Sequence, residues 1–212
     1  MGNYFRGMGD TGKKMAWCTS VGPAELIRSF GFEVHFPENH GALLGATRTA
    51  NDFIPEASKL GYSNDICSYL TADVGSYLLK QTPMTEHYGL KGAPKPDLMV
   101  YSTNQCREVQ DWFMYCAKEL NVPVVGITPP RYLNEVTKEV IDDVAAQYKS
   151  IIPACEKASG QKFDIDKFRE TLRLSKEATH LWKKVLWTAK ASPSPISFFD
   201  ATIHMGPIVV LR

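Results

Sequence analysis

The pattern of apolar and polar positions divides the first 130 or so residues into short strands and helices. Apolar runs of strand length occur at 13–18, 32–36, 97–102 and 122–127. Helical periodicity covers 22–31, 48–60, 64–78 and 105–120, with Pro23 suited to a first helical turn and Gly31 to the position after a helix end. Strands that alternate with helices at this spacing predict an α/β layer built on a parallel sheet.

From residue 132 onward the pattern changes to long helical segments. Periodicity over 134–158 and 164–192, separated by Gly160, predicts a helical hairpin, and 196–204 is a further helix candidate. The apolar run 207–212 is typical of a buried strand. We therefore expect an α/β domain over 1–131, a helical segment over 132–206, and at 207–212 the start of a second α/β domain whose remainder is missing.

Charge and composition narrow the classes of partner. The net charge is +1 and like charges form no long run, so neither nucleic acid nor an anionic membrane is expected as a partner. No apolar run reaches the roughly 18 residues of a membrane span, and the first residues lack the pattern of a signal peptide. Five widely spaced cysteines, an odd number, predict free thiols or metal thiolates rather than a disulfide framework.

Three of these cysteines fall where a loop leads into a helix. Cys18 follows the first strand, Cys67 lies at a helix start, and Cys106 follows the strand 97–102. Such loops meet at the carboxyl edge of a parallel sheet, and a helix N-terminus lowers a thiol pKa, so the three thiols are candidate metal ligands or nucleophiles. The alternative is that they are ordinary buried cysteines, as we expect for Cys116 and Cys155 on apolar helix faces.

The segment 37–48 carries the candidate proton-transfer groups. We expect a glycine-containing loop in which Glu38 or His40 moves a proton beside a polar ligand. The alternative, which the spacing alone favours, is a solvated loop with a hydrogen-bonded histidine. Ser20 belongs to a hydroxyl pair before the helix at 22, where capping of the helix N-terminus is the expected role.

Several segments, in this order, resemble one enzyme family. WCTSVGPAELIRSFGFEV, beginning at residue 17, contains a Cys-x-x-x-Pro-x-Glu-Leu-like pattern from Cys18 with one extra residue before the proline, and Cys67-Ser68-Tyr69 matches a Cys-Ser-Tyr/Phe segment. LMVYSTNQCREVQDWF at 98–113 and the helical stretch 147–177 are similar to later parts of the family. From about residue 13 to 212, the chain resembles the N-terminal portion of the benzoyl-CoA reductase / 2-hydroxyacyl-CoA dehydratase family, which includes the 2-hydroxyglutaryl-CoA dehydratase D-component. The first stretch is more similar to the reductase branch.

The resemblance implies two flavodoxin/Rossmann-like α/β domains with an iron–sulfur cluster between them. Cys18 and Cys67 then match cluster ligands, and Cys106 is the only candidate in this chain for a third ligand that the family takes from its second domain. Ser20 matches a hydroxyl that hydrogen-bonds the thioester carbonyl. The implied cofactor is a [4Fe-4S] cluster, or a double-cubane cluster as in some relatives.

The resemblance also implies an activity and partners. Family members are cytoplasmic enzymes that pair with a homologous sister subunit and reduce or dehydrate an acyl-CoA substrate. An ATP-dependent iron–sulfur activator protein, fed by ferredoxin, supplies one electron at low potential. We expect this chain to be part of such an oxidoreductase or lyase and to be inactive in isolation. The alternatives are a double-cubane-type electron-transfer protein that reduces small molecules and a non-catalytic partner fragment.

Overall fold

The fold is built on a four-stranded parallel sheet. The structure is a computed structural model that describes residues 12–85, 89, 93–131 and 133–211. The strands are β1 (Met15–Cys18), β2 (Glu33–His35), β3 (Leu98–Ser102) and β4 (Val124–Ile127), in the order β2-β1-β3-β4. All three strand pairs are parallel, which confirms the predicted α/β class.

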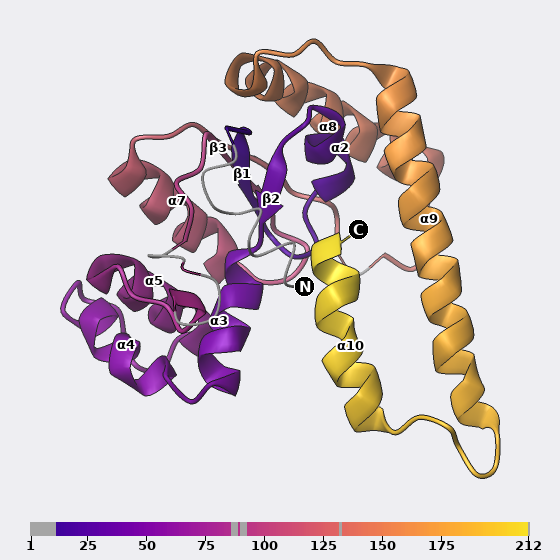
Figure 1. The fold of residues 1–212 in the computed structure, drawn as a ribbon. Helices are drawn as coiled ribbons and strands as arrows, with labels where there is room; N and C mark the ends of the chain where they lie inside the picture. Colours follow the sequence, from indigo (N-terminus) through magenta and orange to yellow (C-terminus); the bar gives the residue numbers. More distant parts are fainter. Residues whose placement is uncertain (1–11, 86–88, 90–92, 132, 212) are drawn as a thin grey trace.

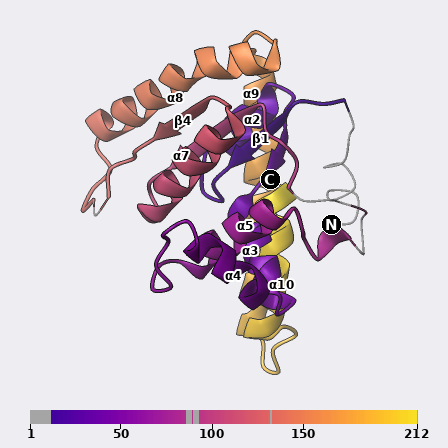
Figure 2. The ribbon, with the colours of Figure 1, turned by 90° about the vertical axis from the view of Figure 1, so that its left-hand side faces the viewer.

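Helices cover both faces of this sheet (Figures 1 and 2). On one face, α2 (Ala24–Ser29) and α8 (Lys138–Ser159) pack against Ala16, Cys18 and Val100. On the other face, α5 (Ser68–Leu79) and α7 (Glu108–Leu120) pack against Trp17 and Met99. Because side chains alternate across a strand, a sheet buried on both faces needs apolar residues at nearly every position, and this explains the continuous apolar runs in the sequence.

The segment predicted as a glycine-containing loop is instead a helix, α3 (Pro37–Ala46), which is followed by α4 (Ala50–Ser58). Gly41 in α3 and Gly75 in α5 allow close helix packing, whereas Gly45 in α3 has open space around it. A Cβ at Gly41 would lie 2.9 Å from the carbonyl oxygen of Tyr69, and a Cβ at Gly75 would lie 2.0 Å from that of Phe53. The glycines in this segment were interpreted as signs of a loop. In the structure, glycine is needed at such positions because the backbones of two helices come into close contact.

The C-terminal third contains the predicted helical hairpin. It comprises α8 and α9 (Ile165–Trp187), and Gly160 ends α8 in the left-handed conformation at φ 73°. After the short η1 (Thr188–Lys190), α10 spans Phe198–Leu211, so the strand predicted at 207–212 is wrong for its described residues. Two reciprocal hydrogen bonds stabilise the N-terminus of this helix. The Ser197 backbone N–H donates to Asp200 Oδ2 (2.8 Å), and the Asp200 backbone N–H donates to Ser197 Oγ (3.2 Å). The apolar run alone does not reveal this capping interaction.

The domain boundaries at 131 and 206 stay predictions. Across the described ranges, no helix is both long enough and apolar enough to cross a bilayer.

Candidate functional site

The strand order places a crevice at the carboxyl ends of β1 and β3. From β1 the chain passes to β2 on one side, and β3 lies on the other side of β1. Loops that leave neighbouring strands in opposite directions open a crevice at this point, where α/β proteins bind ligands. A pocket of about 440 Å³ lies there. Its lining comes from the turn after β1, the loop after β3 and the helices α3, α5, α7 and α10, and includes Ser20, Glu38, Cys67, Cys106, Glu108, Trp112, Met205 and Val209.

Two of the three predicted thiols line this pocket. Cys67 is exposed at the N-cap of α5, as the sequence predicted, and Cys106 is partly buried just before α7. Burial raises the pKa of the Cys106 thiol, and the Glu108 carboxylate and the Cys67 thiol raise it further. The expected lowering by a helix N-terminus is therefore wrong for Cys106, because burial and a neighbouring acid outweigh it. A cation in the pocket would reverse this balance and favour the thiolate.

The third predicted thiol, Cys18, is not among the pocket-lining residues. Its side chain is fully buried on the α2–α8 face of the sheet, and a Cβ added at Gly22 would lie 2.7 Å from its sulfur. The turn from Thr19 to Gly22 therefore covers this sulfur. Among the described residues, no group of three or more His, Cys, Asp and Glu side chains is arranged to hold a metal ion.

Glu38 and Ser20, both predicted from the sequence, are brought together at the pocket. The Glu38 Oε2 atom accepts a 2.6 Å hydrogen bond from the Ser20 backbone N–H, while the buried Oε1 atom has no partner in the described structure. Burial raises the pKa of Glu38 to about 7, although hydrogen bonds from Ser20 favour the ionised form. Near neutral pH this carboxyl group both binds and releases a proton readily. Ser20 does not cap α2, which has no side-chain cap.

His40 occupies a different place from Glu38, although both lie on α3. Its Nδ1 atom lies 2.6 Å from Asp73 Oδ1, and its Nε2 atom lies 2.9 Å from Thr82 Oγ1. His40 and Asp73 are each only 2% exposed, and His40 does not line the pocket. This contradicts the expectation of a solvated loop at residues 37–48. The pair ties α3 to α5, the two helices that carry Glu38 and Cys67.

Sequence reasoning missed several residues around the site. Asp73, Glu108 and Trp112 were not singled out, nor was Met205, which reaches the pocket from α10. Asp73 had a detectable signal, since it is the only acid in the apolar helix 68–79 and a buried acid there requires a partner. The others are brought to the pocket by tertiary packing, which the local pattern does not encode.

Fold and site together define an α/β protein with a thiol-lined crevice at the switch point of a parallel sheet. The family model described as 2-hydroxyglutaryl-CoA dehydratase, D-component, matches residues 19–211. The chain belongs to this family.

Curated relatives agree with this assignment. The chain is 34% identical over 207 residues to an (R)-2-hydroxyisocaproyl-CoA dehydratase alpha subunit of Clostridioides difficile, a match that covers 96% of the chain and 49% of the relative. It is 33% identical over 213 residues to a subunit of the benzoyl-CoA reductase of Thauera aromatica, covering 98% and 48%. An (R)-phenyllactyl-CoA dehydratase alpha subunit of Clostridium sporogenes is 31% identical over 204 residues, covering 96% and 49%.

These matches establish two further points about the chain. It spans about half the length of the curated relatives it matches. The similar identities to dehydratases and to the reductase do not favour the reductase branch that the first stretch suggested.

The donor atoms at the pocket fit an iron–sulfur cluster in kind, because cysteine thiolates are its usual ligands. Cys67 and Cys106 present two such donors to one cavity. The described residues do not assemble a third donor beside them. The pocket thus matches the chemistry of a cluster site without a complete set of ligands.

Proposed function

We propose that this chain is part of a subunit of an iron–sulfur enzyme that reduces or dehydrates acyl-CoA thioesters by single-electron transfer. Family membership supports the substrate class, since the relatives are named as acyl-CoA dehydratase and benzoyl-CoA reductase subunits. The observation that carries the proposal is the pairing of two thiols from different helix starts in one pocket with a carboxyl group that titrates near neutrality.

Cys67 and Cys106 would hold the [4Fe-4S] cluster, or one half of a double-cubane cluster, through their sulfur atoms. When bound, such a cluster supplies one electron at low potential to the thioester substrate. Cys18 would serve as a further ligand only after the turn from Thr19 to Gly22 moves, because that turn covers its sulfur. The positive charge of the iron would offset the burial that now keeps the Cys106 thiol protonated.

Ser20 and Glu38 would act on the substrate beside this centre. The Ser20 hydroxyl would hydrogen-bond the thioester carbonyl, and Glu38 would hold or release a proton at its Oε1 atom. Apolar side chains such as Leu70, Trp112 and Val209 line the same pocket and would exclude water from a radical intermediate.

The proposal includes a homologous sister subunit and an ATP-dependent iron–sulfur activator that ferredoxin charges. The relatives' designations as alpha subunits support the first of these partners. It also includes the cytoplasmic location expected from the family resemblance.

Anaerobic reconstitution tests the proposed function. The chain, and a polypeptide extending it to the relatives' length, are incubated with iron and sulfide and desalted, and their visible spectra and iron and sulfide contents are measured. We expect a broad iron–sulfur absorption and bound iron with sulfide. A colourless, iron-free protein at both lengths would refute the proposal.

A titration of the reconstituted protein with an acyl-CoA then separates the enzyme from a double-cubane-type electron-transfer protein. Saturable binding that perturbs the cluster spectrum is expected of the enzyme. Its absence would favour electron delivery to another small molecule.

A further inference from the structure

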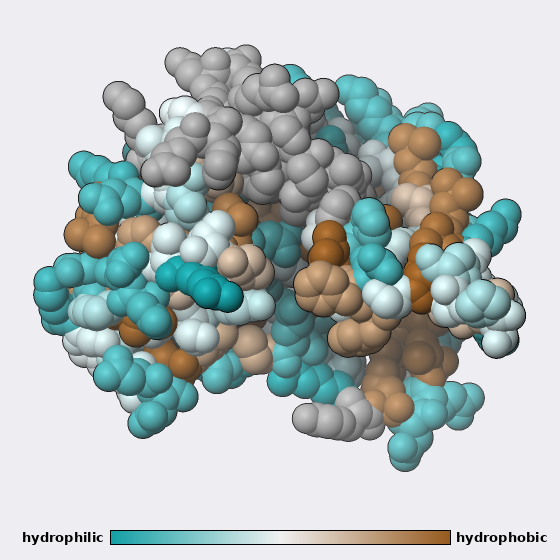
Figure 3. Space-filling view, turned by 60° about the horizontal axis from the view of Figure 1, so that its bottom comes forward, coloured by the Kyte–Doolittle hydropathy of each residue, from teal (hydrophilic) through white to brown (hydrophobic). Residues whose placement is uncertain are grey.

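A second pocket lies between α4 and the segment that follows α5. It measures about 600 Å³ and shares no lining residue with the pocket at the carboxyl ends of β1 and β3, which we now call the first pocket. Figure 3 shows mainly hydrophilic and neutral side chains over the left-hand part of the molecule, where Figure 1 places α3, α4 and α5. Water can enter the second pocket, because most of its polar lining residues are exposed: Asp52, Lys80, Gln81 and Thr85.

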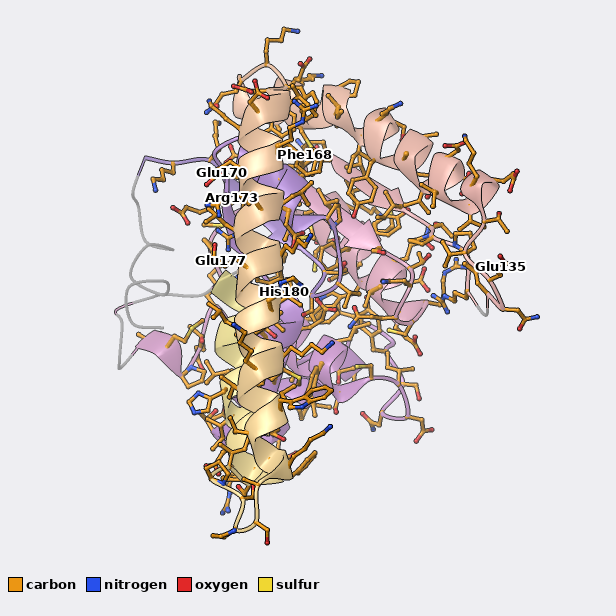
Figure 4. The ribbon with its side chains drawn as sticks, turned by 90° about the vertical axis from the view of Figure 1, so that its right-hand side faces the viewer. Glu135, Phe168, Glu170, Arg173, Glu177 and His180 are labelled. Atoms are coloured by element: carbon orange, nitrogen blue, oxygen red, sulfur yellow. The ribbon has the colours of Figure 1, made fainter. Side chains whose placement is uncertain are left out.

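A buried set of polar groups begins at this second pocket. Thr82 lines the pocket but is only 5% exposed, and its hydroxyl oxygen lies 2.9 Å from His40 Nε2. His40 Nδ1 lies in turn 2.6 Å from Asp73 Oδ1. Other ion pairs of the described residues lie on the surface, such as the pair of Arg173 and Glu170 on α9 (Figure 4). Burying a histidine and an acid is costly unless their hydrogen bonds are made, so the three groups act as one unit.

Asp73 brings this set of groups to the first pocket. Burial raises the pKa of Glu38 to about 7, and the Asp73 carboxylate adds to this rise, so the two carboxyl groups lie close enough to repel each other. Burial likewise raises the pKa of Asp73, while His40 and the Trp112 side chain favour its ionised form. Both Glu38 and Trp112 line the first pocket. Thr82, His40 and Asp73 therefore extend from the second pocket to the wall of the first.

Two other titratable side chains face the buried pair, His35 of β2 and Cys116 of α7. The His35 ring centre lies 6.1 Å from that of His40, and burial, with His40 adding to it, lowers the pKa of His35 to about 3. Burial raises the pKa of the Cys116 thiol well above its ordinary value, and Asp73 raises it further. Both side chains are therefore uncharged near neutral pH. Among the described groups that face the pair, this leaves Glu38 as the one that exchanges a proton near pH 7.

We propose that Thr82, His40 and Asp73 form a proton path that joins the second pocket to Glu38. The Thr82 oxygen takes a proton from water and releases its hydroxyl proton to His40 Nε2. His40 releases its Nδ1 proton to Asp73, and Asp73 passes a proton to Oε1 of Glu38. Thr82, His40 and Asp73 each keep their number of protons, and Glu38 gains one. The reverse sequence carries a proton out.

This path has a use because the first pocket is apolar over much of its lining. A substrate there would exclude water, so the proton that Glu38 binds or releases has to travel through the protein. The inference rests on the proposed function for the role of Glu38. The path itself is present without iron or substrate, and it can therefore be tested without them.

Time-resolved infrared spectroscopy after a rapid drop in pH tests the path in the 212-residue chain alone. The exposed Cys67 thiol is first alkylated with N-benzylmaleimide, which places a bulky group in the first pocket. The C=O band of protonated Glu38 is identified by its loss in Glu38→Gln. Two quantities are measured, the rate at which this band appears and the midpoint of its equilibrium titration. Thr82→Val removes the hydroxyl and nearly keeps the side-chain shape, and Thr82→Ser keeps the hydroxyl as the matched control.

We expect Thr82→Val to slow the protonation of Glu38 at least about tenfold and to leave the titration midpoint unchanged. Thr82→Ser should match the unaltered chain. Thr82→Ala, which also lacks the hydroxyl and adds no bulk, should be as slow as the valine variant and serves if that variant does not fold.

A hydroxyl that only holds His40 in place would give another result, a shifted midpoint or a less stable fold without a selective effect on the rate. The proposal is overturned by that result, by variants without the hydroxyl that are as fast as the unaltered chain, or by the absence of a band that Glu38→Gln removes. None of these outcomes depends on whether the protein binds iron, so failure of the path and failure of the proposed function are distinguishable.

Discussion

Glu38→Gln should change how the stability of the protein depends on pH. The variant keeps an amide oxygen that can accept the Ser20 N–H hydrogen bond, but it removes the titrating proton. The pKa of Glu38 rises from 4.5 to about 7 on folding, chiefly through burial. Between these two values the folded protein binds more protons than the unfolded chain. The unaltered protein therefore loses stability as the pH rises through this window, and the variant does not.

The magnitude follows from the same shift. Each pKa unit corresponds to about 1.4 kcal/mol. The free energy of unfolding of the variant should therefore exceed that of the unaltered chain by an amount that grows with pH. We expect this difference to be near zero at pH 4, about 1 kcal/mol at pH 5 and about 3 kcal/mol at pH 8. Because Glu38 is only 9% exposed, solvent screening reduces this little. Urea denaturation at several pH values measures both free energies. A difference that stays constant from pH 4 to pH 8 would refute a raised Glu38 pKa.

Two further substitutions test the packing beneath the site. His40→Ala should destabilise the fold by about 3 kcal/mol or more in urea denaturation, because it leaves Asp73 buried without its histidine partner. A loss of unfolding free energy below about 1 kcal/mol would mean that the His40–Asp73 pair does not join α3 to α5. Gly75→Ala should prevent folding or lower the free energy of unfolding by at least about 2 kcal/mol, because the added Cβ would overlap the Phe53 backbone. Gly45→Ala is the control, since Gly45 has open space around it; this change should be neutral or stabilise α3 by up to about 1 kcal/mol. Equal effects of the two glycine changes in thermal unfolding would contradict the proposed helix contact.

The sequence predicted the sheet and most helices because their signals are local. Four apolar runs gave four parallel strands, and Gly31 and Gly160 both follow helix ends with positive φ, as predicted. The errors arose where tertiary contacts set the structure. Residues 37–46 contain two glycines and were interpreted as a loop, but Gly41 is required because α3 packs directly on the start of α5.

The site was predictable only in part for the same reason. From their positions at loop-to-helix junctions, the sequence predicted that Cys18, Cys67 and Cys106 meet in one crevice at the sheet edge. In the structure, Cys67 and Cys106 line one pocket and Cys18 does not. Which way each side chain points depends on the register of the strand. Cys18 is the last residue of β1 and faces the α2–α8 side, so its position at a loop junction did not place it in the pocket.

The most direct test of the proposed cluster site is the iron content of single-cysteine variants after identical anaerobic reconstitution in the polypeptide extended to the relatives' length. Cys67→Ser and Cys106→Ser each remove a pocket thiol, and Cys116→Ala removes a buried core thiol outside the pocket as the matched control. We predict that the two serine variants lose most of the bound iron and sulfide while the control keeps the amount found in the unaltered chain. Serine variants that retain the full amount of iron would contradict the assignment of this pocket as the metal centre.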